Sequence, residues 1–221
     1  RACAMAETVT ADTSVAYNPV SDAHESATIH MWVGATRYVL LGSRGTAKIM
    51  VSASGIPYLE FEFTGLWTAP SEQTRPTPTL SGFQRPQIAT KANTPTFTID
   101  EVSLVLRSFT LDLGNQVEPR FLIGPDAERV IIVDKAEAIE MTVEAVPLTT
   151  LNPYTLASTG EQVELQLVHG PTAGSIATID VPNMQMQRPQ ALANAQGIAE
   201  WPLRAVPIPG TGNDQFTLTL T

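Results

Sequence analysis

Tyr58-Leu59-Glu60-Phe61-Glu62-Phe63-Thr64 is the stretch that indicates the fold class most clearly. Its apolar side chains, Leu59, Phe61 and Phe63, alternate with polar ones. A period of two is typical of a β-strand, because successive side chains point to opposite faces of a sheet. The stretch therefore predicts a strand with one buried face and one polar face.

The same pattern continues on both sides of this stretch. Alternation, or a short apolar run between turn residues, predicts strands at Ala27–Val33, Arg37–Leu41, Thr46–Ser52, Tyr58–Leu66, Thr96–Asp100, Val102–Leu106, Ser108–Leu113, Arg129–Asp134, Ile139–Val146, Val163–His169, Ser175–Val181, Gly197–Val206 and Gln215–Thr221. A turn is predicted at Gly42–Gly45. One short helix is predicted at Asn152–Ser158, where Asn152 suits the cap and Pro153 the first position. This spacing predicts an all-β fold, an antiparallel β-sandwich or partial barrel.

Residues 68–95 interrupt the strands with Pro70, Pro76, Pro78, Pro86 and Pro95. Such a segment is extended and lacks a core of its own, so it is predicted to be a linker or a docking arm. Residues 96–221 are then predicted to form a second β-sandwich domain. Residues 1–67 are expected to belong to a first β domain, and the start at Arg1 rather than methionine indicates a chain that begins inside a domain. A weak echo between Gly45–Gly65 and Gly197–Thr219 leaves a duplication open.

Composition argues against several classes of protein. The net charge is -9, with no cluster of Lys and Arg, which argues against binding of nucleic acid through its phosphates. An acidic surface that DNA slides past without sticking stays compatible with this charge. Cys3 is the only cysteine, so neither an intrachain disulfide nor a cysteine zinc cluster is expected. No apolar stretch reaches the roughly 20 residues of a membrane-spanning helix.

The residues that carry chemistry do not form a motif. His24, His30 and His169 lack metal-ligand spacing, and Ser43 lies in a predicted turn without a nucleophile elbow. Paired carboxylates occur on single strand faces, but such faces are more often solvated than catalytic. We therefore predict no catalytic residue, no cofactor and no metal site, and expect a protein that is not an enzyme. A hydrolase whose site is assembled only in space is one alternative.

One longer segment, Ser108–Arg120 followed by Leu122–Gly124 and Val130–Asp134, is similar to the tail tube (major tail) proteins of long-tailed bacteriophages and prophages. The same family pattern is matched, in order, by Arg1–Met5, Tyr17–Val20, Leu41–Thr46, Pro57–Gly65 and Gly212–Thr219. The resemblance covers nearly the whole chain. Proteins of this family extend further at the N-terminus, so the resemblance implies that residues 1–67 are the remainder of a first β domain whose N-terminal part is absent. None of these motifs is catalytic, so the order and spacing of the motifs carry the resemblance.

The resemblance implies a structural virion protein, made in the bacterial host cytoplasm. Copies of it would form trimeric or hexameric rings that stack into a tube, in contact with other tail proteins. Genomic DNA would pass through the lumen without specific binding, and no membrane would be involved. The alternative is a surface or secreted β-sandwich module that binds protein or carbohydrate.

Two sets of residues are candidates for roles in a tube. The acidic strand residues Glu60, Glu62, Glu140 and Glu144 are expected to face the lumen, where they would repel DNA phosphates. The candidates for contacts between subunits, from the proline-rich arm, are Arg75, Pro76, Pro78, Phe83 and Arg85. Such arms are often ordered only by their partners.

Overall fold

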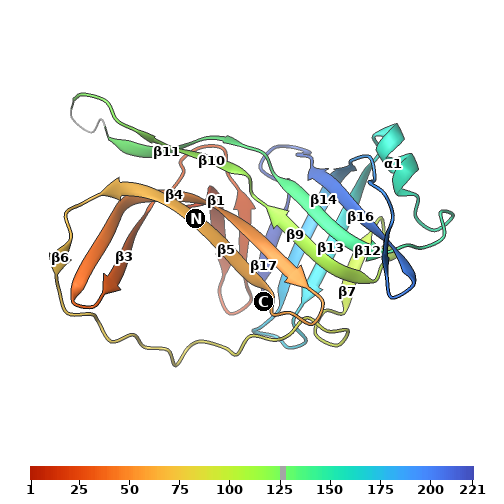
Figure 1. The fold of residues 1–221 in the computed structure, drawn as a ribbon, viewed down its shortest axis with the longest axis horizontal. Coiled ribbons are helices and arrows are strands. Elements are labelled where there is room, and N and C mark those ends of the chain that lie inside the picture. Colours follow the sequence, from red (N-terminus) through yellow and green to blue (C-terminus); the bar gives the residue numbers. More distant parts are fainter. Residues whose placement is uncertain (125–127) are drawn as a thin grey trace.

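A computed structural model describes residues 1–124 and 128–221 (Figure 1). Its strands and helix are β1 (Met5–Thr10), β2 (Ser14–Pro19), β3 (Ala27–Val33), β4 (Thr36–Ser52), β5 (Tyr58–Trp67), β6 (Ser71–Glu72), β7 (Thr96–Ile99), β8 (Val102–Ser103), β9 (Leu106–Asp112), β10 (Asn115–Arg120), β11 (Arg129–Lys135), β12 (Ala138–Glu144), α1 (Pro153–Thr159), β13 (Gln162–His169), β14 (Ala177–Met186), β15 (Ala193–Ala195), β16 (Ile198–Pro207) and β17 (Thr217–Leu220). The predicted all-β class with one short helix is confirmed. α1 begins after Asn152, whose side chain accepts hydrogen bonds from the N–H groups of Tyr154 and Thr155.

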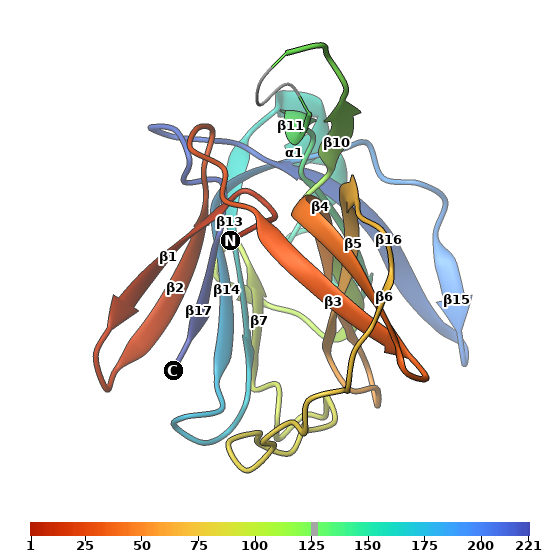
Figure 2. The same ribbon diagram turned by 90° about the vertical axis from the view of Figure 1, so that its left-hand side faces the viewer.

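The strands form two antiparallel layers that meet along one side. The first layer runs in the order β5, β4, β9, β12, β16, and the second in the order β7, β13, β14, β17, β2, β1. The layers join where Met184–Met186 of β14 pairs with Ala205–Pro207 of β16. Figure 2 shows the two layers spreading apart from their upper end. The predicted sandwich or partial barrel is therefore confirmed, and it is open on one side.

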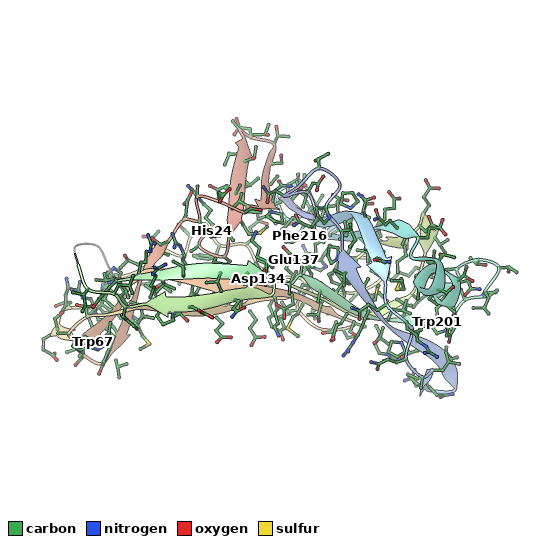
Figure 3. All side chains as sticks on the ribbon, turned by 90° about the horizontal axis from the view of Figure 1, so that it is seen from above. His24, Trp67, Asp134, Glu137, Trp201 and Phe216 are labelled. Carbon is green, nitrogen blue, oxygen red and sulfur yellow. The ribbon has the colours of Figure 1, made fainter. Side chains whose placement is uncertain are left out.

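The core lies where the two layers face each other. Phe109 and Leu111 of β9 are almost fully buried and belong to one cluster with residues of β13 and β16, such as Leu165 and Leu203. Phe216, just before β17, is also fully buried in it, and Figure 3 shows it in the middle of the molecule. The alternating pattern predicted that Phe109 and Leu111 point to the inner face, and the structure confirms this.

The predicted turn at Gly42–Gly45 is wrong. β4 continues through it as one strand of 17 residues. Its pairing with β5 shifts register between Leu41 and Arg44, so one extra residue is accommodated as a β-bulge. Gly42 has φ +56°, a conformation that glycine adopts without steric cost. The glycine that suggested a turn therefore lies in the bulge.

β4 extends beyond the core and forms a projection that we name the tongue. The tongue consists of β3, residues 36–41 of β4, residues 66–67 of β5, and β6, and it lies at the left end of Figure 1. The β10–β11 hairpin is a separate two-stranded sheet that contacts β4 and β5. Arg44 of β4 donates a hydrogen bond to the Val130 carbonyl of β11, which fixes the hairpin to the long strand.

The division into domains at residues 67 and 96 stays a prediction. Strands from both segments pair in one sheet, since β4 of the first segment pairs with β9 of the second. Their buried residues, Ile49 and Leu111 for example, belong to one cluster. Few contacts normally cross a domain boundary, so this pairing counts against two independent cores. The second half of the sequence echo is not a hairpin, because β16 and β17 each pair with β14.

Candidate functional site

The four candidate acidic residues lie on one face of the first layer. Glu60 of β5 is directly opposite Lys48 of β4, and Lys48 is opposite Asp112 of β9. Directly opposed residues share a face, and so do residues two apart along a strand. Glu62 therefore belongs to this face with Glu60.

The same face continues across β12. Thr110, two residues before Asp112, is directly opposite Glu140, and Glu144 follows four residues later on the same strand. Glu140 is in turn opposite Arg204 of β16. We name this surface, turned away from the core, the charged face. The sequence identified its four acidic candidates but could not show that they share a face, because that depends on pairing across five strands.

Basic residues neutralise part of the charged face. Lys48 forms an ion pair with Asp112 at 3.1 Å, and Arg204 forms one with Glu140 at 2.9 Å. Hydrogen bonding to Asp112 raises the pKa of Lys48 above its ordinary value. Glu60, Glu62 and Glu144 form no ion pair within the described residues, so they carry the unbalanced negative charge.

A further pair on this face was missed by sequence reasoning. The Arg107 guanidinium donates from Nε to both carboxylate oxygens of Glu200, at 2.7 and 2.8 Å. The side chain of Glu200 is only 5% exposed, and hydrogen bonding to Arg107 lowers its pKa. No sequence signal links the two residues, because they lie 93 positions apart.

The proline-rich segment is an exposed, extended arm. The candidate contact residues, which are Arg75, Pro76, Pro78, Phe83 and Arg85, are all exposed. The arm starts at the tongue, where β6 pairs with β4 (Figure 1), and rejoins the core at Ala89. Ala89 is buried and exchanges backbone hydrogen bonds with Ser54 and Gly55 in the turn between β4 and β5. The arm is therefore held at its two ends and exposed between them.

An apolar groove opens between the layers where the sandwich does not close. Its volume is about 720 Å³, and its walls include Leu59, Phe61 and Phe63 of β5 and Leu218 of β17. The alternation predicted a buried row on β5, but Leu59 and Phe61 are 46% and 53% exposed. The prediction that these side chains point inward was correct. The prediction that they are buried was wrong, because the second layer does not cover this part of β5.

The histidines and Ser43 do not form a catalytic arrangement. Ser43 is fully buried, and its hydroxyl donates to the Leu40 carbonyl. The Nδ1 atom of His169 lies 3.0 Å from the Thr94 hydroxyl, and burial lowers the pKa of His169. No group of three or more potential metal ligands occurs in residues 1–124 and 128–221. The helix in these ranges is too short to span a membrane.

Nearly the whole chain matches a protein family. Residues 2–221 match the family described as phage tail tube protein. The chain belongs to this family. It is therefore a structural component of the phage tail, and the resemblance drawn from Ser108–Arg120 is confirmed. No curated protein matches the chain.

Proposed function

We propose that copies of this tail tube protein close into rings, that the rings stack around a lumen, and that the charged face lines the lumen through which DNA passes. The match of residues 2–221 to the tail tube family carries this proposal. A tube requires repeated contacts between copies, and a head-to-tail contact that closes by rotation produces rings. Rings of three or six copies remain the predicted symmetry.

The charge of the face supports the lumen assignment. The charged face combines six carboxylates with three cations, so negative charge remains, and this charge would repel DNA phosphates rather than bind them. The carboxylates are those of Glu60, Glu62, Asp112, Glu140, Glu144 and Glu200, and the cations are Lys48, Arg107 and Arg204. Paired charges in the same face keep the repulsion between neighbouring subunits moderate. The lumen would then be hydrophilic and weakly repulsive, as transit without binding requires.

Electron microscopy of the concentrated protein tests the assembly. Rings or hollow tubes with a constant diameter are the expected result, and image averaging gives their symmetry. A chain that stays monomeric at all concentrations and salt conditions would contradict the proposal.

Cysteine labelling of assembled tubes tests the lumen assignment. In a Glu62→Cys variant, a small maleimide should label the tubes, whereas a maleimide on a large polymer should label only dissociated subunits. Glu164→Cys, on an exposed residue of β13 in the other layer, is the control and should react with both reagents. Equal reaction of residue 62 with the large reagent before and after assembly would exclude the charged face from the lumen.

A further inference from the structure

An apolar surface runs along the inner face of the first layer from the groove to the end of the tongue. On β5, Trp67 shares a face with Phe63 and Gly65, since residues two apart point the same way. A Cβ atom added to Gly65 would lie 2.7 Å from the Leu40 Cβ atom, so Leu40 also points to this face. Leu40 is directly opposite Trp67.

Strand β3 continues the surface. Ile29 is opposite Leu40, Met31 is opposite Tyr38, and Val33 lies two residues beyond Met31 on the same face. Register alone therefore places Val33, Met31, Tyr38, Leu40 and Trp67 side by side, and all five are exposed. Figure 3 shows Trp67 at the far end of the molecule from Trp201.

The five tongue residues have no cover within the described chain, because the second layer ends before the tongue. The groove part of the surface differs, since residues 84–87 of the arm also line it. The β10–β11 hairpin lies on the other side of the strands, away from the apolar surface. Arg44, which contacts the hairpin, is directly opposite Thr64, and Thr64 belongs to the polar face of β5. Monomers rarely expose apolar patches larger than a few hundred Å², and larger ones mark interaction sites.

The exposed area fits the contact between two protein chains. Aromatic side chains have areas of about 150–250 Å² and aliphatic ones somewhat less, so the exposed fractions of the five tongue residues amount to on the order of 500 Å². Leu59 and Phe61 of the adjoining groove, 46% and 53% exposed, extend this area. One partner contributes about 800 Å² to an interface of standard size.

We infer that the inner face of the tongue packs against a second copy of this chain. The inference names the contact for the ring or tube assembly proposed above and rests on that proposal for the identity of the partner. A tube needs contacts that continue from copy to copy, so within the proposed assembly this surface would pack against a different surface of the neighbouring copy. This contact leaves the charged face, on the other side of the same strands, free.

A matched pair of variants tests the inference. The test variant carries Met31→Asp and Trp67→Asp, which place unpaired charges on the proposed contact. The control carries Thr28→Asp and His30→Asp, on the opposite face of β3, where both residues are exposed. Both variants introduce two aspartates into exposed strand positions, so both should fold, as circular dichroism and thermal unfolding of the monomers will show.

Self-association is measured by analytical ultracentrifugation and electron microscopy. The test variant should need at least about tenfold more protein to associate, because burying unpaired charge opposes binding, whereas the control should assemble like the original chain. Tubes formed equally well by the test variant would overturn the inference and leave the proposed function standing. Association into closed dimers that the test variant abolishes would support the contact and contradict the tube.

The fluorescence of Trp67 gives a second measurement. Iodide should quench Trp67 in the monomer and lose access to it after association, with a Trp67→Phe variant showing which part of the signal belongs to Trp67. Unchanged quenching in assembled protein would overturn the inference.

Discussion

Arg44 connects three parts of the chain through backbone carbonyls. Its guanidinium donates to His24 and Val130, each at 2.6 Å, and to Glu25 at 3.3 Å. Lys135 reinforces the same region by donating to the Val20 carbonyl. Two cations thus fix the base of the β10–β11 hairpin and the connection between β2 and β3 to the long strand β4.

Replacing Arg44 should therefore lower the stability of the protein. Arg44→Ala leaves several carbonyls without donors, one of them next to the buried Val130 side chain, and should reduce the free energy of unfolding by about 1–3 kcal/mol. Arg44→Lys should lose less stability than Arg44→Ala, because the lysine ammonium group can still donate to some of the carbonyls that the guanidinium reaches. Urea denaturation measures both, and an unchanged stability of Arg44→Ala would show that water satisfies these carbonyls.

Asp214 organises the loop before β17. Its carboxylate accepts hydrogen bonds from the N–H groups of Gly210, Thr211 and Gly212 and from the Thr211 hydroxyl. These bonds favour the charged form and lower the pKa of Asp214 below its ordinary value of 3.8. Its contribution to stability is therefore complete above pH 3.8 and is lost as the pH falls through the lowered pKa.

Asp214→Asn should lower the melting temperature at neutral pH, and the difference from the original chain should shrink as the pH falls below 3.8. Calorimetry over a pH series provides the measurement. Glu161→Gln, on an exposed residue outside this loop, is the control and should show little change. A difference that stays constant with pH would show that the charge of Asp214 has no role in the loop.

At the scale of single elements, the arm combines firm ends with an exposed middle. β6 and Ala89 anchor it, and Leu80 and Phe83 between them are 63% and 78% exposed. Apolar side chains with this exposure contribute little to the stability of the folded monomer. Deleting part of the arm would strain both anchors, so substitutions are the better test of its role.

The variant with Leu80→Ser and Phe83→Ser should unfold within about 0.5 kcal/mol of the original chain, because both changes are at the surface. If the arm contacts a neighbouring subunit, the same variant should assemble less readily in light scattering. Thr77→Ser with Thr79→Ser is the control within the arm. Assembly at the original rate would remove Leu80 and Phe83 from the proposed contacts.

Local patterns predicted most strands, and non-local pairing explains what they missed. Alternation in Phe109–Leu113 is a property of one strand, and it correctly predicted the buried face. The exposure of Phe61 depends on where the opposite layer ends, which no local pattern records. Gly42–Gly45 has the composition of a turn, and only pairing with β5 distinguishes the bulge. The charged face likewise needed the register of several strands.

At the scale of the whole molecule, the two layers share one core across residues 1–67 and 96–221. Leu111 of β9 is fully buried beside residues from β4 and β12, with which β9 pairs. Truncation of a large buried side chain weakens the packing of every strand that it contacts. We therefore expect the two segments to unfold together, in contrast to the predicted division into two domains.

Calorimetry should show a single unfolding transition. Leu111→Ala should lower the free energy of unfolding by about 2–5 kcal/mol, because it leaves a cavity, and should shift the whole transition to lower temperature. Hydrogen exchange should then increase in β4 as well as in β12. Two transitions, with only one sensitive to Leu111→Ala, would support separate domains.

The extra residue in the β4 bulge determines which side of the tongue is apolar. Ala47, Ile49 and Val51 point to the core, and uninterrupted alternation from them would turn Tyr38 and Leu40 toward the charged face. A deletion of one codon between Leu41 and Arg44 would thus leave the composition almost unchanged while inverting the projection. Insertions and deletions at this point would therefore be far more harmful to a phage lineage than amino-acid replacements on either side of it.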